Sequence, residues 1–126
     1  QAICIGAARQ SGQCHLPAIE PSTPLGDLLA AGPTGVGLFA DRVADARPLA
    51  AVLAGRADEP IEILIGPAGG WTEDERRAAR EGGYHPARLG HTTLRTETAA
   101  IAVVAAVLAC ADQADDEGRA RPAQDH

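Results

Sequence analysis

The sequence is poor in aromatic residues and contains neither lysine nor methionine. Its three aromatic residues are Phe39, Trp71 and Tyr84, so we expect a core built from Ala, Val, Leu and Ile. All 11 basic residues are arginines, and 17 acidic residues outnumber them, which gives a net charge of −6. This balance disfavours nucleic-acid binding by bulk charge, and a hydrophobic content of 45% excludes general disorder.

Cysteine pairs and metal-binding motifs are missing as well. Cys4, Cys14 and Cys110 are odd in number and widely spaced, with no CxxC pair. We therefore expect reduced thiols and a cytoplasmic protein rather than a disulfide framework. The four histidines share no metal-ligand spacing, so we expect no metal site. The first residues do not have the pattern of a signal peptide, and we expect Gln1 to lie within a longer parent chain.

The length of 126 residues fits one small domain, in which strands alternate with helices. Apolar runs at residues 36–40 and 61–65 predict two strands, and residues 85–89 predict a third extended stretch. Strands that alternate with helices are typical of an α/β fold with a parallel sheet.

Several short helices are expected between these strands. Thr23 and Pro24 predict the N-cap and first residue of a helix that ends at Gly32. Residues 48–53 predict a second short helix, and the first ten residues have the pattern of the end of another.

A glycine-rich segment follows the second strand. Residues 66–70, GPAGG, precede a helix whose start is a capping box of Thr72 and Glu75 and whose end is Gly82. A turn of this kind at the carboxyl end of a parallel strand lets a ligand approach the backbone closely. The same glycines also suit an ordinary strand-to-helix turn. A P-loop and a GxGxxG motif are excluded, because the lysine and the spacing are absent.

Thirteen consecutive apolar residues, 99–111, predict a helix that is hydrophobic on all sides. The run is shorter than the roughly 20 residues of a membrane span, so we expect it in the core or at a subunit interface and expect no membrane contact. Thr96 or Thr98 is the expected N-cap, and Arg95 suits a carboxylate or a base edge better than packing. Residues 112–126 predict a disordered acidic tail.

Two separated motifs carry a resemblance to a known family. ILIGPAGGWT, then an extended stretch ending in LG, then LRTETA closely resemble the signature of the RsmE family of 16S rRNA methyltransferases. The upstream segment ARQSGQCHLP is similar to a third part of that family's pattern. The resemblance covers residues 1–111.

The resemblance implies a SPOUT domain, which is a parallel α/β sheet flanked by helices with a deep C-terminal trefoil knot. Residues 1–111 would form this domain without its first strand and helix, and the N-terminal PUA-like RNA-binding domain would be absent. It also implies S-adenosyl-L-methionine as methyl donor, a homodimer, and methylation of N3 of a uridine in the 16S rRNA of the small ribosomal subunit.

Carried over position by position, the resemblance places the donor among three loops. The cofactor-binding residues it implies are Ile65, Gly66, Pro67, Gly69 and Gly70, then Leu89 and Gly90, and finally Leu94, Arg95 and Thr96. Backbone groups of glycine-rich loops suit the adenine, because side chains would block its approach.

Arg95 and Glu97 are the candidate catalytic residues. N3 of uracil carries a proton that must leave, and Glu97 is the nearest candidate base beside the donor loops. Arg95 would offset the negative charge that develops on the uracil oxygens. Capping the helix and orienting Arg95 is the alternative role of Glu97.

Four positions depart from the family pattern. Ala68 stands in place of a usual glutamate, Gln13 in place of arginine, and His91 with Thr92 in place of Pro-Arg. These departures favour an alternative hypothesis, a non-catalytic dimeric SPOUT remnant, whereas the intact LRTETA favours the enzyme. A third hypothesis is a SPOUT methyltransferase that acts on another RNA, such as tRNA 2′-hydroxyls, but its knot sequence would differ from LRTET.

Overall fold

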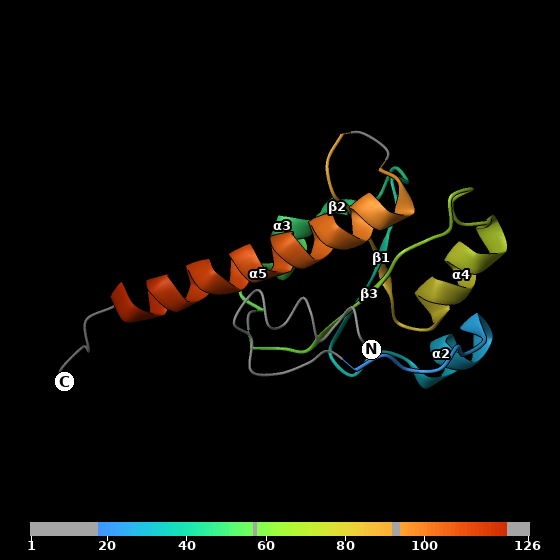
Figure 1. The fold of residues 1–126 in the computed structure, drawn as a ribbon, viewed down its shortest axis with the longest axis horizontal. Helices are drawn as coiled ribbons and strands as arrows, with labels where there is room; N and C mark the ends of the chain where they lie inside the picture. Colours follow the sequence, from blue (N-terminus) through green and yellow to red (C-terminus); the bar gives the residue numbers. More distant parts are fainter. Residues whose placement is uncertain (1–17, 57, 92–93, 121–126) are drawn as a thin grey trace.

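The computed structural model describes residues 18–56, 58–91 and 94–120, which form a parallel sheet with helices on both faces (Figure 1). This arrangement confirms the predicted α/β class with a parallel sheet. The elements in chain order are α2 (Leu25–Ala31), β1 (Val36–Ala40), β2 (Arg47–Pro48), α3 (Leu49–Leu53), β3 (Ile61–Leu64), α4 (Glu73–Glu81), β4 (His85–Arg88) and α5 (Thr96–Ala120).

The strands lie in the order β2–β4–β1–β3, and every pair is parallel. β1 pairs with β3 from Val36↔Ile61 to Phe39↔Leu64, and it pairs with β4 up to Ala40↔Ala87. Because all strands run the same way, the chain leaves β1, β3 and β4 at one shared edge of the sheet.

Small side chains pack both faces of the sheet. One cluster joins Leu38 of β1 to Leu49 and Leu53 of α3, with partly buried residues of α5 packed against it. The other cluster joins Phe39 of β1 to Leu29 of α2 and to residues of α4. Adjacent residues of β1 thus face opposite layers, as the strand period of two requires. Figure 1 shows α3 and α5 on one side and α2 and α4 on the other.

The helix over Glu73–Glu81 begins as the sequence predicts. The Thr72 side chain accepts a hydrogen bond from the Glu75 N–H, and the Glu75 carboxylate accepts one from the Thr72 N–H. This capping box satisfies two N–H groups that the helix leaves without partners. The predicted end of this helix at Gly82 is also confirmed.

The predicted starts of the first two described helices are wrong. Pro24, not Thr23, is the residue before α2, and the Thr23 hydroxyl donates to the Pro21 carbonyl at 3.4 Å instead of capping the helix. Pro48 is not helical, because Arg47 and Pro48 form the short strand β2 beside β4. A two-residue exposed strand has no apolar pattern, so no signal distinguished it from the helix that follows.

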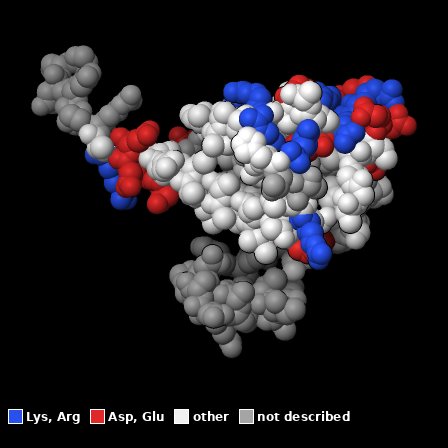
Figure 2. All heavy atoms as spheres, turned by 90° about the horizontal axis from the view of Figure 1, so that it is seen from above, with Lys and Arg blue, Asp and Glu red and all other residues white. Residues whose placement is uncertain are grey.

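The last helix is longer than its apolar run. α5 continues to Ala120, so residues 112–120 are helical and the expectation of a disordered tail from residue 112 is wrong for them. Extending an existing helix needs no new nucleation, and Ala, Gln and Glu propagate it well. Its acidic last turns project from the body of the molecule (Figure 2). Residues 121–126 lie outside the described part, as do residues 1–17 with Cys4, Gln13 and Cys14.

α5 is also less enclosed than expected. Ala99 and Val103 are buried, but Ile101, Val104 and Leu108 are 73%, 59% and 63% exposed. By length and composition alone, α5 could cross a membrane, because its most apolar window of 18 residues has a mean hydropathy of 1.5. The thirteen-residue apolar run is therefore too short a basis for excluding a membrane span. One face of α5 packs against α3 and the sheet, so this face belongs to the core of the domain.

Candidate functional site

A cavity of about 820 Å³ lies at the carboxyl edge of the sheet. This edge is where open parallel sheets bind their ligands, and the volume suits a ligand of drug size. Its walls come from the ends of β1 and β4, from residues 66–70 (the glycine loop), and from the start of α5. The lining residues are Ala40, Asp41, Arg42, Ile65, Gly66, Pro67, Ala68, Gly70, Trp71, Ala87, Leu89, Leu94, Arg95, Thr96, Glu97 and Ala99.

The glycine loop makes a defined turn between β3 and α4. The Gly70 N–H donates to the Pro67 carbonyl at 2.9 Å, and Gly70 has a φ of 79°. A side chain is strained in this left-handed region, so glycine is required there. Residues 67–70 are exposed, and Gly66, Pro67, Ala68 and Gly70 line the cavity.

Trp71 links the end of the glycine loop to β1. Its indole N–H donates to the Ala40 carbonyl at 2.9 Å, and its ring meets Phe39 edge-on with the ring centroids 6.0 Å apart. A Cβ at Gly66 would lie 3.0 Å from the indole ring, so only glycine fits there without a shift. The indole therefore packs directly against the backbone at the start of the loop.

Thr96 connects the same loop to α5. Its hydroxyl donates to the Gly66 carbonyl at 3.0 Å. Thr96 is the first residue of α5, so its side chain joins two walls of the cavity and does not act as the predicted N-cap. The two walls thus meet through a side-chain contact between residues thirty positions apart.

Four charged side chains line the cavity, at Asp41, Arg42, Arg95 and Glu97. The Arg76 guanidinium of α4 donates from Nε to the Asp41 carboxylate at 2.6 Å, and the side chains of Arg76 and Asp41 are 23% and 11% exposed. The hydrogen bond to Asp41 is the largest cause of a raised pKa for Arg76. Asp41 is therefore held by a cation, at the end of β1.

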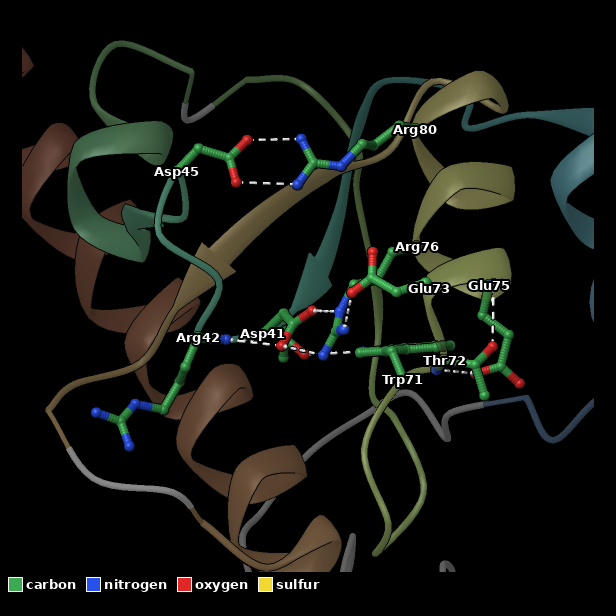
Figure 3. A network of polar contacts seen from close by, with 10 residues as sticks. Asp41, Arg42, Asp45, Trp71, Thr72, Glu73, Glu75, Arg76 and Arg80 are labelled. Atoms are coloured by element: carbon green, nitrogen blue, oxygen red, sulfur yellow. Dashed lines mark hydrogen bonds and ion pairs between the residues drawn. The ribbon is translucent and has the colours of Figure 1, made fainter.

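A second arginine of α4 holds the segment that follows β1. Arg80 makes two hydrogen bonds to the Asp45 carboxylate, at 2.6 and 2.9 Å, and this pairing lowers the pKa of Asp45. Figure 3 shows Arg76 and Arg80 reaching from α4 to the two aspartates. One helix face thus anchors both ends of the segment that carries Arg42.

Most of the site residues expected from sequence come together at this cavity. Ile65, Gly66, Pro67, Gly70, Leu89, Leu94, Arg95, Thr96 and Glu97 line it. Gly69 does not line it, and Gly90 lines a smaller cavity of about 320 Å³ beside α3 and α5. His91 also lines the smaller cavity, and Thr92 lies outside the described residues.

Sequence reasoning missed the contribution of β1. Asp41 and Arg42, which follow β1, line the cavity without being part of any quoted motif. Trp71 also lines it and lies within the motif ILIGPAGGWT, but was not named as a site residue. The rule that ligands bind at the carboxyl ends of parallel strands could have indicated Asp41 and Arg42, since they directly follow the strand at residues 36–40. The hydrogen bond of Trp71 to β1 has no sequence signal, because it joins residues 31 positions apart.

Among residues 18–56, 58–91 and 94–120, no cluster of three or more His, Cys, Asp or Glu side chains could hold a metal ion.

Residues 1–108 match the RNA methyltransferase domain family. The chain belongs to this family. Ribosomal RNA small subunit methyltransferase E of Mycobacterium tuberculosis is 33% identical over 114 residues, which cover 85% of this chain and 42% of the relative. The enzyme of the same name from Treponema pallidum is 51% identical over 47 residues, 37% of this chain and 18% of the relative. The chain thus spans less than half the length of these relatives and is an RsmE-like domain.

Two solved structures of bacterial methyltransferases are similar to this fold. A methyltransferase from Legionella pneumophila in complex with SAM matches with a TM-score of 0.76 and 28% identity, over 86% of this chain and 43% of that one. Ribosomal RNA small subunit methyltransferase E from Neisseria gonorrhoeae, bound to S-adenosyl methionine, matches with a TM-score of 0.73 and 35% identity, over 84% and 44%. RNA methyltransferase domains therefore share the fold that builds this cavity.

Proposed function

We propose that this chain is the donor-binding and catalytic domain of an S-adenosylmethionine-dependent RNA methyltransferase that methylates N3 of a uridine in 16S rRNA. The cavity at the carboxyl edge of the sheet is the observation that carries the proposal. Support comes from the two similar methyltransferases whose structures contain S-adenosylmethionine. When bound, this cofactor supplies an electrophilic methyl group on a sulfonium.

The backbone of the glycine loop is suited to hold the donor. Ile65, Gly66, Pro67 and Gly70 line one wall of the cavity, and Leu89 and Leu94 to Thr96 line the others. Apolar side chains at Ile65, Leu89 and Leu94 suit an adenine face, and backbone groups of the loops suit hydrogen bonds to its edge. Gly69 and Gly90 do not line this cavity and remain proposed contacts beside it.

The reaction requires a nucleophilic nitrogen at uracil N3. We assign Glu97 as the base that removes the N3 proton and Arg95 as the cation that offsets charge on the uracil oxygens. Both side chains line the cavity at the start of α5 and are exposed, so the uracil ring of an RNA bound outside the domain can reach them. The methyl group then moves from sulfur to N3, S-adenosylhomocysteine is left, and the proton ends on Glu97 before it passes to water.

A homodimer in the cytoplasm, with the 16S rRNA of the small ribosomal subunit as partner, completes the proposal. The exposed side chains of Ile101, Val104 and Leu108 lie on one face of α5, and apolar surface of this kind favours burial against a second copy. A deep C-terminal trefoil knot is part of the same proposal. With a net charge of −6, the domain has little positive surface for RNA phosphates, so RNA affinity would come from elsewhere in the enzyme.

The test is methyl transfer to small ribosomal subunits that lack the modification. Radiolabelled donor is added, the rRNA is digested, and the nucleosides are separated by mass. We expect 3-methyluridine, with a large loss for Glu97→Gln and none for Glu81→Gln, an exposed glutamate on α4. Label in a 2′-O-methyl nucleoside would contradict N3 methylation and support action at another RNA position.

A non-catalytic, donor-binding dimer is the second candidate. The methyl side chain of Ala68 lines the cavity and offers no charge at that wall. Binding of S-adenosylhomocysteine without methyl transfer to small subunits by the full-length protein would favour this candidate.

A further inference from the structure

Trp71 is the only tryptophan of the chain, and it lies at the junction of three parts of the cavity. Its side chain is half-buried and lines the cavity. Figure 3 shows the indole reaching from the start of α4 toward Asp41 at the end of β1.

The indole N–H extends the connection between β1 and the chain that follows β3. The β1–β3 ladder ends at the pair Phe39↔Leu64, one residue before Ala40. The Ala40 carbonyl accepts the Trp71 N–H at 2.9 Å. Beyond the ladder, this hydrogen bond therefore ties the end of the glycine loop back to the neighbouring strand.

The indole ring also fixes the beginning of the loop. It lies so close to Gly66 that an added Cβ would be 3.0 Å from Cε2 and Nε1. The Gly66 carbonyl in turn accepts the Thr96 hydroxyl at 3.0 Å. A shift of the indole would move Gly66 and, through Thr96, the first turn of α5.

We propose that Trp71 is a positioning residue for the methyl donor, which keeps the glycine loop in its binding shape through the hydrogen bond from its N–H to Ala40. This inference rests on donor binding in the cavity, as proposed above. Trp71 acts through the loop, so its loss lowers donor affinity by raising the fraction of molecules in which the loop has left this shape. A preformed loop avoids that ordering cost on binding.

The sharpest variant replaces the indole N–H alone. Benzothienylalanine at position 71 has the shape of tryptophan with sulfur in place of the N–H, so packing on Phe39 and Gly66 is kept and the donor to Ala40 is lost. The control is Phe39→Leu, which removes the edge-on ring contact of Trp71 but no residue that lines the cavity. Phe39 is fully buried, so this control also loses stability.

Two measurements on the full chain test the proposal. In calorimetry with S-adenosylhomocysteine, we expect the benzothienylalanine variant to bind about tenfold more weakly than the parent, and the less stable Phe39→Leu to bind within about twofold of it. Without ligand, hydrogen exchange at the Gly70 amide, which donates to Pro67, should accelerate in the benzothienylalanine variant only. Unchanged exchange and affinity in that variant would overturn the proposal.

The ligand-free measurement separates this inference from the proposed function. Suppose that Gly70 exchanges faster in the benzothienylalanine variant, while the unmodified chain does not bind S-adenosylhomocysteine. This result would support the positioning of the loop by Trp71 and would reject donor binding. Equal acceleration of exchange in both variants would overturn the inference, because general loss of packing would then explain the effect.

Discussion

The Thr96 hydroxyl donates a hydrogen bond to the carbonyl of Gly66, at a distance of 3.0 Å. The bond joins the first residue of α5 to the first glycine after β3, so two walls of the cavity are connected by one side chain. Thr96 is half-buried, and the same hydroxyl would cap the helix if the sequence expectation held. In the structure this hydroxyl bonds to the glycine loop instead, so the start of α5 is part of the cavity wall.

Thr96→Val should weaken binding of S-adenosylhomocysteine. Valine keeps the branched shape but removes the hydroxyl, so the Gly66 carbonyl loses its partner at a net cost of about 1 kcal/mol, or roughly fivefold in affinity. Thr98→Val makes the same chemical change at an exposed position of α5 that does not line the cavity. Calorimetry should therefore find parent-like affinity for Thr98→Val, and equal losses in the two variants would disprove the role given to Thr96.

Gly66→Ala and Gly69→Ala should have different effects, because only the first adds a methyl group beside Trp71. A Cβ at Gly66 would lie 3.0 Å from the indole of Trp71, whereas a Cβ at Gly69 has nothing within 4 Å. We expect Gly66→Ala to displace the indole, shift the tryptophan emission maximum and lower the affinity for S-adenosylhomocysteine at least tenfold. Gly69→Ala should leave the emission maximum near the parent value, and an equal shift in the two variants would contradict the contact assigned to Gly66 and the indole.

The sequence allowed prediction of the parts of the site whose signals are local. The apolar run at residues 61–65, the glycines after it and the capping box of Thr72 are neighbours in the chain. The structure confirms the capping box and places the strand at Ile61–Leu64, one residue shorter than predicted. The local pattern alone predicted only a helix cap at the start of α5. The resemblance to the RsmE family added the prediction that this segment is part of the donor site.

Contacts between distant residues had no such signal. The bonds from Trp71 to Ala40 and from Arg76 to Asp41 join residues 31 and 35 positions apart, and only the order of the strands brings them together. The two-residue strand β2 has no periodicity to detect, and the helix over residues 112–120 is an extension of an apolar helix into a polar sequence. Each of these features depends on the tertiary fold and not on the local sequence pattern.

Tyr84 should titrate at unusually high pH. It is the single tyrosine and is buried, and desolvation, followed by its hydrogen bond to Glu62, raises its pKa from 10.0 to about 12. Since the folded-state pKa lies above the unfolded one, its contribution to stability is complete below pH 10 and is lost as pH rises from 10 to 12. Ultraviolet absorbance should follow one phenol ionising near pH 12. The melting temperature of Tyr84→Phe should fall less over that range than that of the parent, and a phenol that ionises near pH 10 would contradict this account.

Val104→Glu should convert the protein to a monomer. Val104 is 59% exposed on the apolar face of α5, and a charge there would have to be desolvated in an interface between two copies. Light scattering should give twice 12.9 kDa for the parent and for the control Ala30→Glu, on the exposed side of α2, and 12.9 kDa for Val104→Glu. A monomeric parent that floats with lipid vesicles would instead mean that this face meets a membrane.

The most direct measurement of the central claim is calorimetric titration of the chain with S-adenosylhomocysteine, the product that methyl transfer leaves from the donor. The account predicts saturable binding of one ligand per chain, with a matching change in Trp71 fluorescence, because that side chain lines the cavity. A chain that circular dichroism shows to be folded, but that releases no heat and shows no change in emission at millimolar ligand, would contradict it.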